Sequence, residues 1–157
     1  MTDIPAPLPL EEQLCFAVYA AAHAFGQTYR PLLEPHGLTY PQYLVLLQLW
    51  EGDDRSVREL GERLFLDSGT LTPLLKRMEA AGWVTRQRDA RDARIVRIRL
   101  TPKGEALRPV AAAIPGVLRC AAGLPAAELA QLRDTLRLLA SRLREAEVAA
   151  PGPMAAG

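Results

Sequence analysis

One stretch of the chain has a clear helical pattern and reads Leu64-Phe-Leu-Asp-Ser-Gly-Thr-Leu-Thr-Pro-Leu-Leu-Lys-Arg-Met-Glu79. Its apolar side chains recur at positions i, i+3, i+4 and i+7, the spacing of one buried helix face: Leu71, Leu74, Leu75 and Met78. A polar face is left for solvent or a ligand, made of Ser68, Thr70, Thr72, Lys76 and Arg77. The stretch predicts an amphipathic helix with a partly basic outer face.

The start of this helix has two interpretations. Pro73 has no backbone N–H, so a helix that begins at Ser68 loses a hydrogen bond there and bends in its first turns. Alternatively, Thr72 caps a helix that starts at Pro73. The sequence leaves both open, and Gly82 ends the helix in either case.

The flanking segments complete a DNA-binding layout in a chain that is otherwise mainly α. Ser56-Val-Arg-Glu59 has the capping-box pattern that opens a helix, and Leu66-Asp-Ser-Gly69 is a break after it. Residues 83–88 and 95–100 have strand patterns, and the charged loop 89–94 joins them. Two helices around a tight turn, followed by a small β-hairpin with a basic tip, predict a winged helix-turn-helix.

Two helices are expected before this motif. The first spans about residues 11–33 and ends around 35–37. The second reaches Trp50 from Thr39-Tyr-Pro-Gln42, a capping-box pattern with an early proline. Residues 1–9 contain three prolines and are expected to be flexible.

Helices are also expected after the motif. Thr101 and Pro102 stand in the preferred order of cap and first helical residue, and Pro115-Gly116 should kink or interrupt that helix. A last helix runs from about residue 126 to 148, with leucines along one side: Leu129, Leu132, Leu136, Leu139 and Leu143. Residues 150–157 are expected to be disordered.

Residues 10–149 are expected to form one domain, because 157 residues with 49% hydrophobic content can bury a single core. The winged helix-turn-helix occupies about 39–101. The leucine stripe either packs on its own chain or, as we favour, helps the helices at about 10–36 and 102–149 to form a dimerisation layer. A two-fold homodimer would present two recognition helices to a palindromic operator in double-stranded DNA.

Charge and composition narrow the partners and the compartment. The net charge is +1, but nine basic and three acidic residues between Lys76 and Lys103 give that segment +6, and the remainder −5. A local basic surface favours DNA phosphates, although a merely solvated basic surface would give the same count. We expect no membrane span and no signal peptide. The two cysteines lack metal spacing and suggest a reducing, cytoplasmic compartment.

Longer strings give the chain a family resemblance over about residues 10–145. The string from Leu64 to Glu79, with Gly82 and Asp92-Ala-Arg94, resembles the MarR family of winged-helix regulators. Other strings resemble its organic-hydroperoxide-sensing branch, the OhrR repressors: Leu14-Cys15-Phe16-Ala-Val-Tyr19, Tyr29-Arg-Pro31 and Leu38-Thr-Tyr40-Pro-Gln-Tyr43.

The resemblance implies a homodimer that represses a peroxide-detoxification gene and leaves DNA when an organic hydroperoxide oxidises Cys15. It also implies that Tyr29 and Tyr40 of the partner subunit hold the Cys15 sulfur. The spacing of Cys15 and Tyr29 is compatible, since nearly four helical turns place both on one side of a helix, about 21 Å apart along it. One chain does not bring them together, whereas an antiparallel copy could.

The chemistry of Cys15 requires a thiolate, which is the form that attacks a peroxide oxygen. Phenol hydroxyls can stabilise it by hydrogen bonds, and the start of a helix gives modest help. Phe16, Tyr19 and Phe25 could form an apolar wall that favours a hydroperoxide with an apolar tail. The residues alone also allow an inert, buried thiol.

Cys120 is the second cysteine of the chain. The resemblance places the chain with two-cysteine relatives, in which the second cysteine forms a disulfide with the sensing cysteine of the other subunit. We therefore expect Cys15 to become a sulfenic acid that Cys120 of the partner subunit resolves, which would strain the dimer and separate the DNA-binding modules. A cysteine that only packs is the alternative.

The recognition helix and the wing supply the candidate DNA contacts. Hydroxyls can reach phosphates or base edges, and cations add charge, with arginine able to fork onto guanine: Ser68, Thr70, Thr72, Lys76 and Arg77. Arg94 is expected in the minor groove, oriented by Asp92. The arginines of the strands are expected to contact phosphates or to line solvated strand faces: Arg86, Arg88, Arg97 and Arg99.

Two other functions stay open on the sequence. One is a MarR-type repressor released by a non-covalent phenolic or lipophilic ligand, with Cys15 incidental. The other is a thiol peroxidase, although the chain lacks the Thr/Arg-flanked cysteine of such enzymes. We expect no enzyme activity, no cofactor and no metal. His23 and His36 have no partners at metal spacing and are expected to be structural.

Overall fold

The computed structural model describes residues 7–146, and the chain divides into two compact units, Met1–Pro115 and Gly116–Gly157. Residues 1–6 of the expected flexible N-terminus, and the expected disordered tail 150–157, lie outside the described residues. Residues 7–9 have no regular structure. The single domain over 10–149 stays a prediction.

The N-terminal part forms the two helices that the sequence predicts, with one early interruption. A 3-10 turn, η1 (Leu10–Glu12), precedes α1 (Leu14–Leu33), because Gln13 between them is extended and its side-chain amide donates to the Leu8 carbonyl at 3.0 Å. The turn η2 (Glu34–His36) ends at Gly37, whose φ of 70° favours glycine. The helix α2 (Tyr40–Glu51) then starts with the predicted Thr39–Gln42 capping box.

The helix-turn-helix begins with the second predicted capping box. Ser56 and Glu59 exchange two hydrogen bonds, of 2.7 and 3.1 Å, at the start of α3 (Val57–Leu64). The recognition helix α4 (Ser68–Ala80) starts at Ser68, because the Asp67 carboxylate accepts the N–H of Thr70 at 2.9 Å. A helix start at Pro73 is therefore wrong.

The recognition helix buries the face that its spacing predicts. Its four apolar residues are almost wholly inaccessible to solvent: Leu71, Leu74, Leu75 and Met78. They join a core formed with α2, α3 and the sheet, which includes Leu46, Leu60 and Ile98. Burial of this stripe holds the helix in place although Pro73 removes one of its hydrogen bonds.

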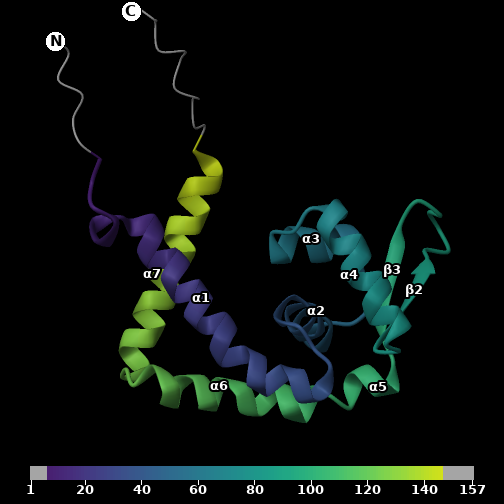
Figure 1. The fold of residues 1–157 in the computed structure, drawn as a ribbon. Helices are drawn as coiled ribbons and strands as arrows, with labels where there is room; N and C mark the ends of the chain where they lie inside the picture. The colour runs from purple at the N-terminus through teal and green to yellow at the C-terminus, as the bar shows by residue number, and fades with distance from the viewer. Residues whose placement is uncertain (1–6, 147–157) are drawn as a thin grey trace, which may run out of the picture. The chain divides into compact units, whose positions relative to one another are not determined.

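The wing is confirmed as an antiparallel hairpin, with one strand more than expected. β2 (Val84–Arg88) pairs with β3 (Val96–Leu100), in a register that places Arg86 opposite Ile98. The added strand, β1 (Arg55–Ser56), pairs with the other edge of β3, so the order is β1-β3-β2. Two residues are too few to show a strand pattern. Figure 1 shows the hairpin beside α4.

A tight joint connects the hairpin to the next helix. Thr101 caps α5 (Pro102–Glu105) as predicted: its hydroxyl accepts the Gly104 N–H at 3.1 Å and donates to the Gly82 carbonyl at 2.6 Å. Lys103 donates to the Ala81 carbonyl at 2.7 Å, at the end of α4. A Cβ atom at Gly104 would overlap the carbonyl oxygen of Trp83, so glycine is needed there.

The C-terminal helices break at a different place from the one expected. The structure has no interruption at Pro115-Gly116; α6 (Arg108–Ala122) runs through them, and the break falls at residues 106–107, between α5 and α6. Pro109 explains this break, because a proline fits the first turn of a new helix but cannot donate to a preceding turn.

The last helix, α7 (Ala126–Glu145), carries the predicted leucine stripe. Three leucines of the stripe are exposed, Leu132, Leu136 and Leu143, while Leu129 and Leu139 are half-buried. The predicted end at 148 lies outside the described residues. Within residues 7–146, no single helix is long and apolar enough to cross a membrane; by length and composition, segments 102–122 and 126–145 would qualify only as one bent pair.

Candidate functional site

Three tyrosines form a cluster where α1 meets α2. The ring centroids of Tyr29 and Tyr40 are 4.6 Å apart, and Tyr43 lies 5.7 Å from Tyr29 and 6.3 Å from Tyr40. Tyr43 is buried, Tyr29 is half-buried and Tyr40 is 41% exposed. The structure thus brings together two of the predicted sensor residues and adds Tyr43, which the i, i+3 spacing from Tyr40 on α2 could have indicated.

The cluster raises the pKa of its phenols. Burial, followed by the neighbouring Tyr40 and Tyr43, raises the pKa of Tyr29 to about 12. Burial also raises the pKa of Tyr40 and of Tyr43 above the usual value. The raised pKa values extend to higher pH the range over which the three hydroxyls stay protonated and can donate hydrogen bonds.

Tyr29 and Tyr40 border a pocket of about 330 Å³ on the first unit. Its wall combines the phenol rings with apolar residues and two charged side chains: Gly26, Tyr29, Arg30, Leu33, Glu34, Leu38, Thr39 and Tyr40. Tyr29 and Tyr40 thus line the same pocket.

Cys15 lies in the first turn of α1 and is exposed. Its sulfur is 3.9 Å from the Gln13 side-chain oxygen. Nearby on the same helix, Phe16 stacks on Tyr19 with centroids 6.4 Å apart, and Tyr19 stacks on His23. Because α1 is continuous from Leu14 to Leu33, Cys15 and Tyr29 of one chain stand about 21 Å apart along it.

The other predicted thiol and Phe25 are also accessible. Cys120 lies near the end of α6, and it is exposed and free. Phe25 on α1 is 47% exposed. Among residues 7–146, no group of three or more His, Cys, Asp or Glu side chains is placed to hold a metal ion.

The recognition helix presents the predicted polar residues on its outer face. Ser68, Thr70, Lys76 and Arg77 are exposed, and Thr72 is half-buried. The Thr70 hydroxyl donates to Asp67 at 2.9 Å, so the helix cap orients it. A groove of about 790 Å³ runs between α3, α4 and the wing, and the candidate DNA contacts on its walls are Ser68, Thr72, Arg86, Asp92 and Arg94.

The wing tip exposes Arg94 beside Asp92. The Arg94 side chain is 94% exposed, its backbone N–H donates to the Asp92 carboxylate at 2.9 Å, and its Nε lies 3.6 Å from the same oxygen. Arg86 on β2 is more enclosed, since 21% of its side chain is exposed and its Nη1 lies 3.6 Å from Glu79. Their DNA contacts stay predictions.

Arg97 and Arg99 pair with acidic residues, whereas the sequence suggested phosphate contacts or solvated strand faces for them. Arg97 donates to the Asp89 carboxylate at 3.0 Å and to the Asp54 carbonyl at 2.7 Å. Arg99 donates two hydrogen bonds, of 2.9 and 3.0 Å, to the Asp54 carboxylate. Asp54 lies more than forty positions before these arginines in the chain, so their pairing had no local signal.

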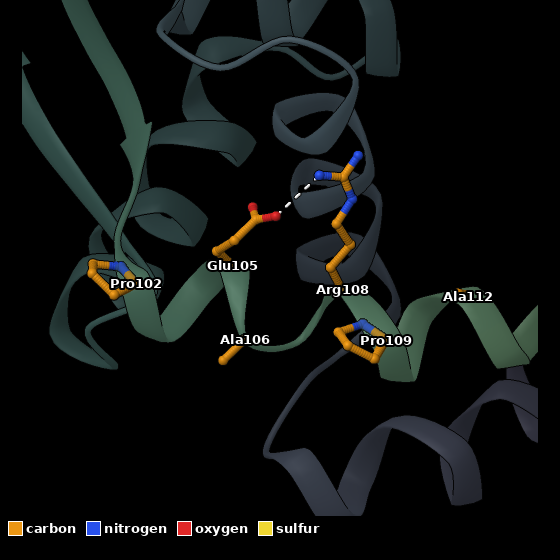
Figure 2. Close-up of a pocket in the computed structure, with 6 residues that line it drawn as sticks. All are labelled: Pro102, Glu105, Ala106, Arg108, Pro109 and Ala112. Atoms are coloured by element: carbon orange, nitrogen blue, oxygen red, sulfur yellow. Dashed lines mark hydrogen bonds and ion pairs between the residues drawn. The ribbon is translucent and has the colours of Figure 1, made fainter.

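A separate pocket of about 570 Å³ lies at the junction of α5 and α6 and contains none of the predicted site residues. Figure 2 shows its lining, with the Glu105–Arg108 ion pair of 3.0 Å at one side. Arg108 also lies 3.4 Å from the Trp50 carbonyl oxygen. These contacts tie α6 to the end of α2.

Known proteins share this sequence and fold. Residues 27–108 match the family model described as transcriptional regulator SarA/Rot. The HTH-type transcriptional regulator TtmR of Methylorubrum extorquens (strain PA1) is 56% identical over 137 residues, 87% of this chain and 70% of TtmR. The organic hydroperoxide resistance transcriptional regulator of Bacillus subtilis (strain 168) is 45% identical over 138 residues, 88% of this chain and 94% of the relative.

Solved structures of AbfR from Staphylococcus epidermidis are also similar. Reduced AbfR bound to DNA gives a TM-score of 0.75 at 37% identity, covering 87% of this chain and 93% of AbfR. Disulfide-formed AbfR gives 0.58 at 38% identity, covering 83% and 91%. The winged fold, the family match and these relatives agree: the chain is a DNA-binding transcriptional regulator and belongs to the MarR family of winged-helix proteins, of the SarA/Rot type.

Proposed function

We propose that the chain is a homodimeric repressor that binds a palindromic operator and releases it when an organic hydroperoxide oxidises Cys15. One observation carries the proposal: α1 holds the exposed thiol of Cys15 near one end and, towards the other end, the phenol of Tyr29, which packs against Tyr40 of α2. The name of the Bacillus subtilis relative and the disulfide form of AbfR support it.

The surface of α1 supports pairing with a second copy. Its exposed apolar residues would be unfavourable in water: Leu14, Phe16, Val18, Tyr19 and Phe25. In an antiparallel pair of α1 helices, a two-fold axis near Ala22 would place Cys15 opposite Tyr29 of the partner subunit, since position 22 is midway between 15 and 29. The small residues Ala20, Ala21, Ala22 and Ala24 surround this point. They would permit a close approach.

The reaction would proceed in two balanced steps. The Cys15 thiolate attacks the outer peroxide oxygen, an S–O bond forms, the O–O bond breaks, and the alcohol leaves with a proton. Phenols of the partner's Tyr29 and the partner's Tyr40 would donate hydrogen bonds to the sulfur. The thiolate of the partner's Cys120 then attacks the sulfenic sulfur: an S–S bond forms, the S–O bond breaks, and the hydroxide leaves as water after taking a proton from the solvent.

Oxidation would act on DNA binding by changing the distance between the two recognition helices of the dimer. Two recognition helices of a dimer must match half-sites about one helical turn apart. A disulfide between the subunits that changes this spacing would weaken operator binding. The cytoplasmic location expected from the sequence stays a prediction.

A DNA-release assay tests the proposal. Operator-bound protein is titrated with cumene hydroperoxide at fixed salt, using wild type, Cys15→Ser and Cys120→Ser. Wild type should dissociate and Cys15→Ser should not, while Cys120→Ser should form the sulfenic acid but no disulfide-linked dimer on a non-reducing gel. Release of Cys15→Ser by the hydroperoxide would contradict the proposal and favour a repressor controlled by a non-covalent ligand.

A further inference from the structure

We propose that Asp89 and Arg97 form a clamp that holds the wing tip and positions Arg94 for DNA, with Asp54 anchoring the clamp to the loop after α2. The wing clamp consists of Asp54, Asp89, Arg97 and Arg99. The inference rests on DNA binding through the wing and does not depend on Cys15 oxidation. Asp89 and Asp54 act as positioning residues, because neither is proposed to touch DNA.

Asp89 connects the tip of the wing to its stem. One carboxylate oxygen, Oδ1, accepts the backbone N–H groups of Arg91 at 2.8 Å and Asp92 at 3.2 Å. The other, Oδ2, accepts Nε of Arg97 on β3 at 3.0 Å. The Asp89 N–H closes the loop by donating to the Ile95 carbonyl at 2.9 Å. A single side chain therefore fixes the turn and its attachment to the sheet.

Arg97 carries this attachment to the rest of the winged motif. Its Nη1 donates to the Asp54 carbonyl at 2.7 Å and lies 3.8 Å from the Glu59 carboxylate on α3. Asp54 is one of two non-glycine residues with positive φ in the described chain, at 59°. Its carboxylate accepts both hydrogen bonds of Arg99. Paired, charge-assisted hydrogen bonds offset the cost of this backbone conformation.

The chain of contacts ends at Arg94. The backbone N–H of Asp92 donates to the Asp89 carboxylate at 3.2 Å. The Asp92 carboxylate in turn accepts the backbone N–H of Arg94 at 2.9 Å. The backbone of Arg94 is fixed, while its side chain is almost wholly exposed. Fixing the loop before binding reduces the conformational entropy that is lost on DNA. Hydrogen bonds from Arg91 and Arg97 lower the pKa of Asp89 to about 2, so its carboxylate stays charged in mildly acidic as well as neutral solution.

The substitution Asp89→Asn tests the contact of Asp89 with Arg97 separately from its contacts within the turn. Asparagine keeps an oxygen for the N–H groups of Arg91 and Asp92 but opposes Arg97 with an amide that donates. The change also raises the net charge by one. Simple electrostatics therefore predicts tighter DNA binding, and the clamp predicts weaker binding.

The experiment measures operator affinity and its salt dependence under reducing conditions for wild type, Asp89→Asn, Arg94→Ala and the double variant. We expect Asp89→Asn to weaken binding about 5- to 10-fold and to lower the salt slope about as much as Arg94→Ala does. With Arg94→Ala already present, Asp89→Asn should have no further effect. Thermal unfolding checks that each variant folds, and Arg97→Lys, which loses the bridging geometry but keeps the charge, should behave like Asp89→Asn.

Asp134→Asn is the matched control. Asp134 also pairs with an arginine, Arg133, at 2.8 Å, and it lies on the side of α7 opposite the leucine stripe. This variant should bind DNA at least as tightly as wild type. Undiminished binding by Asp89→Asn, an equal loss with and without the Arg94 side chain, or no loss in Arg94→Ala would each overturn the clamp. Failure of hydroperoxide to release wild type would contradict the proposed function and leave the clamp standing.

Discussion

The rings of Tyr29 and Tyr40 lie 4.6 Å apart and are tilted by 49°, although they belong to different helices and are eleven positions apart in the chain. The contact joins the end of α1 to the first residue of α2. It holds two phenol donors side by side at the edge of a pocket. The proposed role of Cys15 depends on such donors, because a thiolate is stabilised by hydrogen bonds from neutral groups.

Tyr29→Phe should slow the oxidation of Cys15. Losing a hydrogen bond to a charged group costs about 1.5–3 kcal/mol, so the rate constant should fall by about tenfold or more at neutral pH. The rate is measured by stopped-flow mixing with cumene hydroperoxide. Tyr43→Phe is the matched control, because Tyr43 is buried and does not line the pocket that Tyr29 and Tyr40 border, so this variant should change the rate less than the Tyr29 variant does. Equal rates for wild type and Tyr29→Phe would refute the role of this phenol.

Arg77→Ala should weaken operator binding and relax its sequence preference. Arg77 is exposed on the recognition helix, and loss of a forked contact to guanine costs about 1–3 kcal/mol, or about 5- to 150-fold in Kd. Competition between operator and scrambled DNA measures both effects. Arg137→Ala removes the same charge from the exposed surface of α7 and should leave the preference unchanged. If both variants lost affinity equally, the effect would be one of net charge.

Gly104→Ala should destabilise the protein, whereas Gly116→Ala should not. A Cβ at Gly104 meets the Trp83 backbone, and overpacking of this kind costs about 1–3 kcal/mol or more. A Cβ at Gly116 has no atom within 4 Å, and replacing a helical glycine with alanine stabilises by about 0.5–1 kcal/mol. Melting temperatures at equal protein concentration compare the two. An unchanged melting temperature for Gly104→Ala would show that the joint yields.

The Asp89 carboxyl should still be ionised at pH 4. Its pKa in the folded protein is about 2, below the ordinary 3.8, so its contribution to stability is present above the ordinary pKa and is lost as pH falls through about 2. The chemical shift of its carboxyl carbon, followed by NMR from pH 7 to pH 4, should barely move. A titration midpoint near 4 would contradict the hydrogen bonds from Arg91 and Arg97. Arg97→Gln should raise the midpoint.

Local signals predicted much of the fold correctly. The two capping boxes, at Thr39 and Ser56, and the Thr101 cap stand where expected, because each depends on residues three positions apart. The buried stripe of α4 followed from helical spacing in the same way. The sequence left two possible starts for α4, and the structure decides between them: the Asp67 carboxylate accepts the Thr70 N–H, so the helix starts before Pro73.

The sequence did not predict contacts between segments that lie far apart in the chain. β1 has two residues and exists because β3 pairs with it. The contacts of Asp54 with Arg97 and Arg99 join residues more than forty positions apart, so the sequence assigned these arginines only to DNA phosphates or to solvated strand faces. Tyr43 shares a helix face with Tyr40, which the sequence could indicate. Its ring contact with Tyr29 comes from the packing of α1 on α2, which the sequence did not predict.

A mixed dimer tests most directly whether the thiol of one subunit works with the phenols of the other. Subunits carrying Cys15→Ser are paired with subunits carrying Tyr29→Phe, and the rate of hydroperoxide oxidation of the single Cys15 is measured. If the site is shared, this thiol faces the intact Tyr29 of the Cys15→Ser subunit and reacts at the wild-type rate. A rate as slow as that of the Tyr29→Phe homodimer would contradict the shared site.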